Sequence, residues 1–228
     1  RQIGEVVASV NRLLKDPKTG GIRLNTDFGG IQHSLGRAFS FAYGEKENGA
    51  VFRHMAVMYA FGLYLRRKPE AGRKVWSTLY RMATDTPAAG IFPCVPEYFN
   101  AAGRGMYCYL TGSASWLIYL LLTQVFGVRG ERGDLVIDPQ LTREDFGADG
   151  TCSIRTHFAG RGLRIVFVNA KGLRPGQYAV SRVAAGGKPL ALLPREQGGI
   201  RLSRRVIGSW PADREIRLTV NLESHAPF

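Results

Sequence analysis

The spacing of hydrophobic positions changes near residue 130 of the chain. Before that point, apolar residues recur three and four positions apart, which places them on one face of an α-helix. After it, short β-rich runs alternate with turns that contain Gly and Pro, a pattern typical of strands. The pattern therefore predicts a helical first half and a β-rich second half.

Four helices are expected in the first half, over residues 5–15, 50–67, 70–84 and 113–126. The second and fourth of these are apolar around most of their circumference, which indicates burial on most sides. Two long segments, 22–48 and 85–110, show no helical pattern, and long loops in compact domains are commonly functional. Buried helices joined by long loops are the pattern of an α/α barrel whose loops build the site.

The second half predicts an antiparallel β-sandwich. Its short candidate strands are separated by Gly and Pro turns at the spacing found in such sandwiches. The candidate strands are 134–138, 151–158, 162–169, 177–183, 189–193, 199–203 and 215–222.

The net charge of the chain adds little to the predicted two-part architecture. Lys and Arg number 31 against 18 acidic residues, for a net charge of +13. A strongly basic protein suggests nucleic-acid binding, but here the excess is spread evenly and forms no basic stripe. We therefore expect a solvated surface and no nucleic-acid partner, with an anionic substrate as the alternative.

No segment approaches the roughly 18 apolar residues that a membrane span needs, and the first residues lack the pattern of a signal peptide. The three cysteines, Cys94, Cys108 and Cys152, have no CxxC spacing, and the four histidines have no metal-ligand spacing. This usage favours free thiols in a reducing compartment. We expect a cytoplasmic protein with no membrane partner and no metal.

Residues 45–54 run from a charged turn directly into the second expected helix. Asn48 could cap this helix, and His54 would lie within its first two turns. Because helix N-termini favour anions, a histidine there is well placed to bind phosphate. The alternative is an ordinary capping turn followed by a hydrogen-bonded core histidine.

Residues 109–116 precede and open the fourth expected helix. Thr111 and Gly112 could offer a hydroxyl and backbone N–H groups to an oxyanion, which glycine allows to approach closely. An ordinary cap by Thr111 or Ser113 is the alternative. Two helix N-termini of this kind, each after a long loop, favour one shared anion site.

Five segments of the chain, in this order, resemble the C-terminal half of glycoside hydrolase family 94. They are E-N-G-A-x-F-x-H (47–54), P-E-Y (96–98), Y-L-T-G-S-A-S-W (109–116), F-G-V-x-G (126–130) and D-L-V-I-D-P (134–139). That family contains cellobiose, cellodextrin, chitobiose and β-1,2-oligoglucan phosphorylases, and the phosphorylase-like region of cyclic β-1,2-glucan synthases. The resemblance covers about residues 20–170.

The resemblance implies a fold and two domains. Residues 1–128 would be the C-terminal helices and loops of an (α/α)6 catalytic barrel, and residues 129–228 a C-terminal antiparallel β-sandwich of the jelly-roll type. It also implies that His54, Thr111 and Gly112 bind phosphate.

The resemblance further places Lys46, Glu47 and Glu97 among the substrate-binding residues, with Lys46 against the acceptor sugar. The family's general acid is an Asp expected upstream of these 228 residues, so the chain itself supplies no catalytic residue and is expected to be inactive alone. No cofactor is implied, since inorganic phosphate is a co-substrate.

The implied reaction is inverting phosphorolysis of a β-linked glucan or oligosaccharide to α-glucose 1-phosphate, and the stretch around residues 98–116 looks nearest to the β-1,2-oligoglucan type. The implied partners are the sugar, phosphate and the rest of the catalytic barrel, and a homodimer is an option. Two alternatives stay open: the phosphorylase-like region of a cyclic β-1,2-glucan synthase, and a carbohydrate-binding fragment without catalytic activity.

Overall fold

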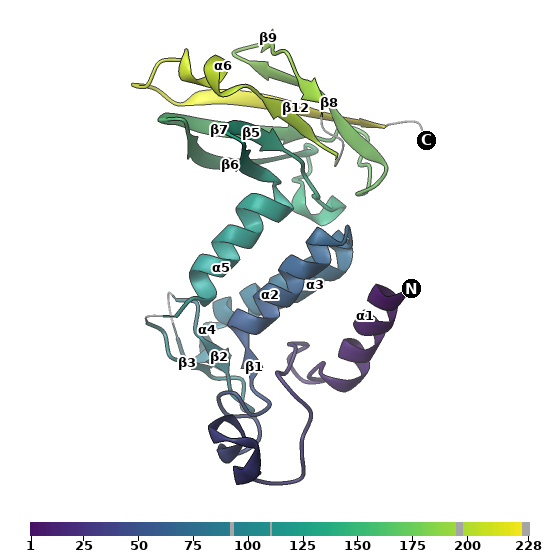
Figure 1. Ribbon diagram of the computed structural model, residues 1–228, viewed down its shortest axis with the longest axis vertical. Coiled ribbons are helices and arrows are strands. Elements are labelled where there is room, and N and C mark those ends of the chain that lie inside the picture. Colours follow the sequence, from purple (N-terminus) through teal and green to yellow (C-terminus); the bar gives the residue numbers. More distant parts are fainter. Residues whose placement is uncertain (92–93, 110, 195–197, 225–228) are drawn as a thin grey trace. The chain divides into compact units, whose positions relative to one another are not determined.

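The computed structural model describes residues 1–228 except 92–93, 110, 195–197 and 225–228. The chain divides into two compact units, Arg1–Leu120 and Leu121–Phe228. Figure 1 shows that helices dominate the first unit and strands the second.

The helices of the first unit follow the predicted order along the chain. They are α1 (Gln2–Leu13), α2 (Arg53–Leu65), α3 (Pro69–Thr84), the short α4 (Thr86–Ala89) and α5 (Ser113–Leu120), with the 3-10 helices η1 (His33–Leu35) and η2 (Arg37–Ser40). Helix α3 begins with Pro69, a residue suited to the first helical position. The segment expected to be helical over 113–126 ends as an α-helix at Leu120, and Leu121–Val125 (η3) is π-helical.

Helices α2 and α3 pack side by side and form the core of the first unit (Figure 1). Tyr64 from α2 and Leu79 from α3 are fully buried in this contact. Gly72 permits the close approach, because a Cβ built on it would lie 2.6 Å from the Tyr64 ring. Removing these apolar surfaces from water is the main stabilising contribution to the pair.

A small antiparallel sheet lies beside these helices, in the order β1-β2-β3. Its strands are β1 (Val51–Phe52), β2 (Tyr98–Phe99) and β3 (Gly105–Met106), each two residues long. Val51 pairs with Phe99, and Tyr98 pairs with Met106. The sheet joins the start of α2 to the segment 85–110, which was expected to be a loop.

The second unit contains a four-stranded and a five-stranded sheet. The four-stranded sheet has the order β10-β11-β5-β4, with β4 (Val128–Glu131), β5 (Asp134–Ile137), β10 (Leu193–Pro194) and β11 (Ile200–Leu202). The five-stranded sheet has the order β6-β7-β12-β8-β9, with β6 (Thr151–Phe158), β7 (Arg161–Val168), β8 (Tyr178–Ala185), β9 (Lys188–Pro189) and β12 (Ile216–Ser224). The short helices η4 (Arg143–Asp145) and α6 (Arg204–Gly208) complete the unit. Ile165, Phe167, Leu218 and Val220 are fully buried at the centre of the five-stranded sheet.

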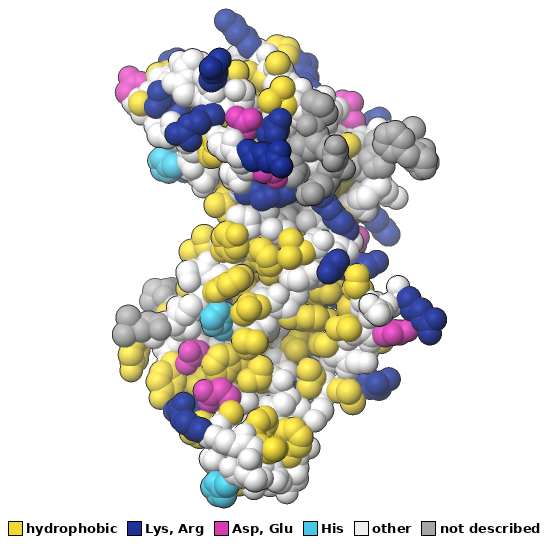
Figure 2. Space-filling view, in the orientation of Figure 1, with side chains coloured by type: hydrophobic (Ala, Val, Ile, Leu, Met, Phe, Trp, Pro, Cys, Tyr) yellow, Lys and Arg dark blue, Asp and Glu magenta, His cyan; other side chains and the backbone are white. Residues whose placement is uncertain are grey.

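The expected fold class is wrong for the helical half. Among the described residues of the first unit, the helices form no (α/α)6 barrel. Their surfaces explain why, because a barrel helix is covered on most sides. Met55 on α2 is 46% exposed and Ile118 on α5 is 65% exposed, while α1 has no buried residue. Figure 2 accordingly shows exposed hydrophobic side chains over much of the visible face of the first unit.

The expectation that the strands of the sandwich are all antiparallel is also wrong. Strand β12 pairs in parallel with β7, with Leu218 opposite Ile165, and antiparallel with β8. The five-stranded sheet is therefore mixed. Alternating apolar and polar residues predict a strand and its buried face, but not the direction of its neighbour. None of the helices in the described part of the chain is both long and apolar enough to cross a membrane.

Candidate functional site

The start of α2 positions the first predicted phosphate ligand. Strand β1 runs directly into the helix, so that Phe52 is its N-cap residue and His54 is its second residue. The predicted cap at Asn48 is wrong. Asn48 is buried in the preceding turn, where its Nδ2 donates to the Phe41 carbonyl at 2.7 Å and its Oδ1 accepts from Asn25 at 3.1 Å. Its amide therefore holds the turn rather than the helix.

The structure brings His54 and Gly112 together, although they begin different helices. A Cβ built on Gly112 would lie 3.3 Å from Cε1 of His54 and 3.6 Å from both ring nitrogens. The imidazole also faces Trp116 of α5, with ring centroids 5.9 Å apart. With glycine at position 112, no side chain of that residue lies against the imidazole on this side.

Thr111 and the first turn of α5 form a connected hydrogen-bond group. The Thr111 hydroxyl accepts from the Ser113 backbone N–H at 3.2 Å and lies 3.0 Å from the Ser113 hydroxyl. The Gly112 carbonyl accepts from Ser115 Oγ and from the Trp116 backbone N–H, each at 3.0 Å. These bonds fix the backbone at the N-terminal end of α5, where the first N–H groups of the helix point outward.

Lys46 lies among aromatic rings. Its Nζ is 4.9 Å from the ring centroid of Phe41 and 5.1 Å from that of Tyr107. Lys46 has φ of +46° and Tyr107 has φ of +57°, a region in which residues other than glycine are uncommon. A cation held over two rings is a cation–π arrangement, and it ties the turn at 45–48 to the strand β3 segment.

Glu97 is held by its backbone in the small sheet. Its carbonyl accepts from the Arg53 N–H at 2.8 Å, and its N–H donates to the carbonyls of Met106 and Tyr107 at 3.1 and 2.9 Å. Glu97 is therefore fixed beside the start of α2. Burial raises the pKa of the neighbouring Tyr98 to about 12, and the carboxylates of Glu45 and Glu97 act in the same direction.

Two buried polar groups near these residues lack hydrogen-bond partners in the described part of the chain. One is Oε2 of Glu47, a predicted substrate ligand. The other is the whole guanidinium of Arg53, which is fully buried and has its Cζ 5.5 Å from the centroid of Phe99. Burial lowers the pKa of Arg53 to about 10, and the nearby Cys94 opposes this.

Arg53 was not among the site residues predicted from the sequence. Arginine is rarely fully buried unless paired, and position 53 was read only as the variable residue before His54. The available signal was the set of apolar residues on either side of it, in β1 and α2. They indicate that this stretch of chain enters the core.

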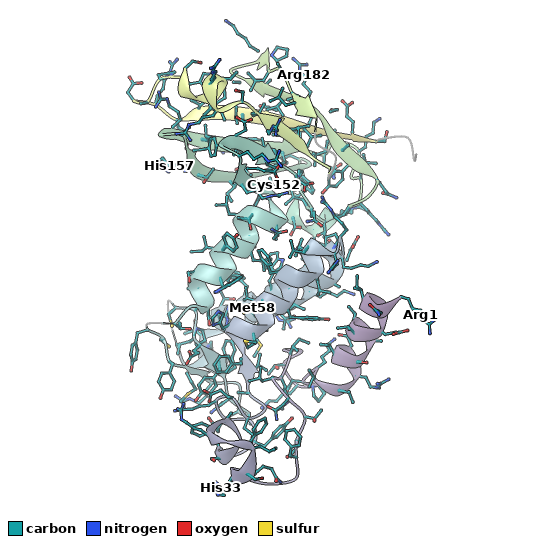
Figure 3. All side chains as sticks on the ribbon, viewed as in Figure 1. Arg1, His33, Met58, Cys152, His157 and Arg182 are labelled. Atoms are coloured by element: carbon teal, nitrogen blue, oxygen red, sulfur yellow. The ribbon has the colours of Figure 1, made fainter. Side chains whose placement is uncertain are left out.

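A pocket of about 480 Å3 lies elsewhere in the first unit, lined by residues of α1, α2 and α3. None of the predicted site residues lines it. His33 lies in η1, near the tip of this unit in Figure 3, where its Nδ1 is 3.2 Å from Ser40 Oγ. Among the residues that the structure describes, no group of three or more His, Cys, Asp or Glu could hold a metal ion.

The arrangement combines two kinds of recognition. The imidazole of His54, the Thr111 hydroxyl and two helix N-termini suit an anion such as phosphate. Lys46, Glu97 and the rings of Tyr107 and Phe41 suit the hydroxyl groups and apolar face of a sugar. The backbone bond between Arg53 and Glu97 links the two groups through the small sheet.

Comparison with known proteins bears on this chemistry. No family model matches the chain. Over 176 residues the chain is 27% identical to cellobionic acid phosphorylase of Neurospora crassa, and the match covers 68% of the chain. The chain spans only 22% of the length of that relative. The name of the relative does not support the expected β-1,2-oligoglucan type. The chain is thus distantly similar to part of a phosphorylase that acts on a sugar acid.

Proposed function

We propose that this chain is the phosphate-holding region of an inverting sugar phosphorylase. The observation that supports this best is the contact between Gly112 and the imidazole of His54. It joins two helix N-termini, each with a polar side chain, at one point. The distant similarity to a phosphorylase supports the same reading.

In the proposed reaction, phosphate attacks the anomeric carbon from the face opposite the leaving sugar, giving an α-sugar 1-phosphate and a shortened saccharide. No second carboxylate is required, since phosphate takes the place of the activated water of an inverting hydrolase. The protein must orient a dianion and offset its repulsion from nearby carboxylates. His54 and Thr111 would donate hydrogen bonds to phosphate, and Gly112 would leave room for its oxygens.

The proposed sugar ligands are Lys46, Glu47 and Glu97. The buried Oε2 of Glu47, which lacks a partner among the described residues, supports a role in accepting a sugar hydroxyl. Tyr107 beside Lys46 offers a ring face. The general acid stays an expectation from the family resemblance, and we assign none of the residues described here to that role.

Phosphate binding to the 228-residue chain tests the proposal, measured by calorimetry or by 31P NMR. We expect His54→Ala to weaken binding about tenfold or more, the loss of a hydrogen bond to a charged group. His33→Ala is the matched control, since His33 is exposed and hydrogen-bonded near Ser40, and it should leave binding unchanged. Equal affinity in the wild type and His54→Ala would contradict the proposal.

The sugar specificity requires a parent protein that supplies the general acid. Release of sugar 1-phosphate should be compared with cellobionic acid, cellobiose and a β-1,2-glucan as substrates. Preference for the sugar acid would agree with the relative's name, and preference for the β-1,2-glucan would restore the linkage expected from the motif. Sugar binding without any phosphate binding would identify a carbohydrate-binding region instead.

A further inference from the structure

Two of the cysteines flank the β2–β3 hairpin. Cys94 precedes β2, and Cys108 follows β3. The two strands pair antiparallel, and the pairing continues past them where the Glu97 N–H donates to the carbonyls of Met106 and Tyr107. Because antiparallel pairing brings the flanking segments together, it places the two cysteines on adjacent stretches of chain.

The two cysteines are neighbours across the hairpin. Continued outward, the β2–β3 register sets Cys108 opposite Pro96, so that Cys94 is its diagonal neighbour, two positions away on the same face of the hairpin. Cys108 is exposed and Cys94 is half-buried, and both are reduced in this structure. Diagonal neighbours on paired strands need a movement of only a few ångströms to reach the geometry of a disulfide. The thiol of Cys108 is thus open to reagents in solution, and that of Cys94 is partly shielded.

The buried guanidinium of Arg53 interacts electrostatically with Cys94. Burial and Cys108 raise the pKa of Cys94 to about 11, and Arg53 acts in the opposite direction. Arg53 has no hydrogen-bond partner among the described residues. A buried positive charge favours an anionic sulfur near it. Arg53 is thereby placed to help Cys94 enter or leave a disulfide as a thiolate.

We propose that Cys94 and Cys108 are a reversible oxidation site, closed to a disulfide by exchange with a low-molecular-weight disulfide. The exposed Cys108 thiolate attacks one sulfur of the small disulfide, forming a mixed disulfide and releasing one small thiolate. The Cys94 thiolate then attacks Cys108 Sγ and displaces the second small thiolate. The two cysteines lose two electrons and two protons, and the small disulfide is reduced to two thiols.

The disulfide would close the loop from residue 94 to residue 108, which carries Glu97 and Tyr107. Closing a loop restricts the unfolded chain and holds the hairpin together. Oxidation would therefore restrain the residues proposed to contact the sugar. This effect on binding rests on the proposed function, whereas formation of the disulfide does not.

The test is thiol counting on the full 228-residue chain after incubation with oxidised glutathione. The wild type should fall from three free thiols to one and lose the mass of two hydrogens. Cys152→Ser is the matched control, because Cys152 lies on β6 in the second unit (Figure 3), and it should still form the bond. Cys94→Ser and Cys108→Ser should form no internal disulfide. Three free thiols remaining in the wild type, or loss of the bond in Cys152→Ser, would overturn the proposal.

Two further measurements separate the parts of this inference. The oxidised wild type should melt about 5 °C higher than the reduced protein, and an equal or lower melting temperature would contradict closure of this hairpin.

Arg53→Met should slow the second exchange step about tenfold, with Arg53→Lys restoring most of the rate. An unchanged rate in Arg53→Met would remove Arg53 from the mechanism. Phosphate affinity of the reduced chain tests the proposed function separately, since the thiol count does not depend on it.

Discussion

Gly112 lies so close to His54 that a Cβ at this position would be 3.3 Å from Cε1 of the imidazole. The two residues belong to the starts of α5 and α2, which follow different long segments of the chain. The space that glycine leaves beside the ring is the space in which an oxyanion would meet both the imidazole and the backbone of α5.

We expect Gly112→Ala to weaken phosphate binding about tenfold. The added methyl group would occupy the oxyanion's place and shift the imidazole by a few tenths of an ångström, while the cost in stability stays below about 1 kcal/mol. Calorimetry and urea unfolding would measure the two effects. Gly62→Ala on α2 is the control, because nothing lies within 4 Å of a Cβ built there; it should keep phosphate affinity and gain up to about 1 kcal/mol from helix propensity. Equal phosphate affinity in both variants would refute the role of Gly112.

Arg53→Met should raise the free energy of unfolding by about 1–3 kcal/mol. The guanidinium is fully buried without a hydrogen-bond partner among the described residues, so the folded state carries a desolvation cost that methionine removes. Its contact with the Phe99 ring offsets part of this cost.

Urea denaturation of the reduced protein would measure the change, with the exposed Arg66→Met as a control expected to alter stability by less than about 0.5 kcal/mol. A loss of more than about 1 kcal/mol in Arg53→Met would show that the charge stabilises the fold.

Asp16→Asn should destabilise the protein by about 2 kcal/mol at neutral pH. The buried carboxylate accepts from the backbone N–H groups of Lys18 and Thr19 and pairs with Arg23. Burial by itself would raise the pKa of Asp16, but the Thr19 N–H and Arg23 outweigh it and hold the pKa below 3.8.

The stability that comes from this lowered pKa is present above pH 3.8 and is lost as the pH falls through the folded-state pKa. Unfolding from pH 7 to pH 2 should therefore show the wild type and Asp16→Asn converging in acid. The exposed Asp27→Asn should change stability by less than about 1 kcal/mol at any pH. Parallel curves for the wild type and Asp16→Asn would contradict the assignment.

Gly127→Ala should destabilise the second unit by about 3 kcal/mol or more, while Gly133→Ala should cost about 1 kcal/mol. Both glycines have positive φ, of +66° and +87°, so alanine is strained at either position. At Gly127 the new Cβ would also overlap the carbonyl of Asp138, whereas nothing lies within 4 Å at Gly133. Thermal unfolding would measure the difference, and equal losses would mean that the close approach of Gly127 to Asp138 is not maintained in solution.

Local patterns in the sequence determined the long elements. The apolar stripe of residues 70–84 predicted α3 to within one residue, and the short β-rich run over 151–158 predicted β6. Such patterns work because a long helix or strand buries one face of its own residues. Strands β1, β2 and β3 are each two residues long and carry no periodic signal, so the small sheet that joins His54's helix to Glu97 was not predictable.

The sequence by itself determined which residues have the chemistry for an anion and a sugar, and their order along the chain. Only the tertiary structure decided that Gly112 lies against His54, that β12 runs parallel to β7, and that the Arg53 guanidinium is fully buried. The physical reason is that propensity and periodicity act between near neighbours in the chain. Contacts between distant segments depend on how whole elements pack, which no short pattern encodes.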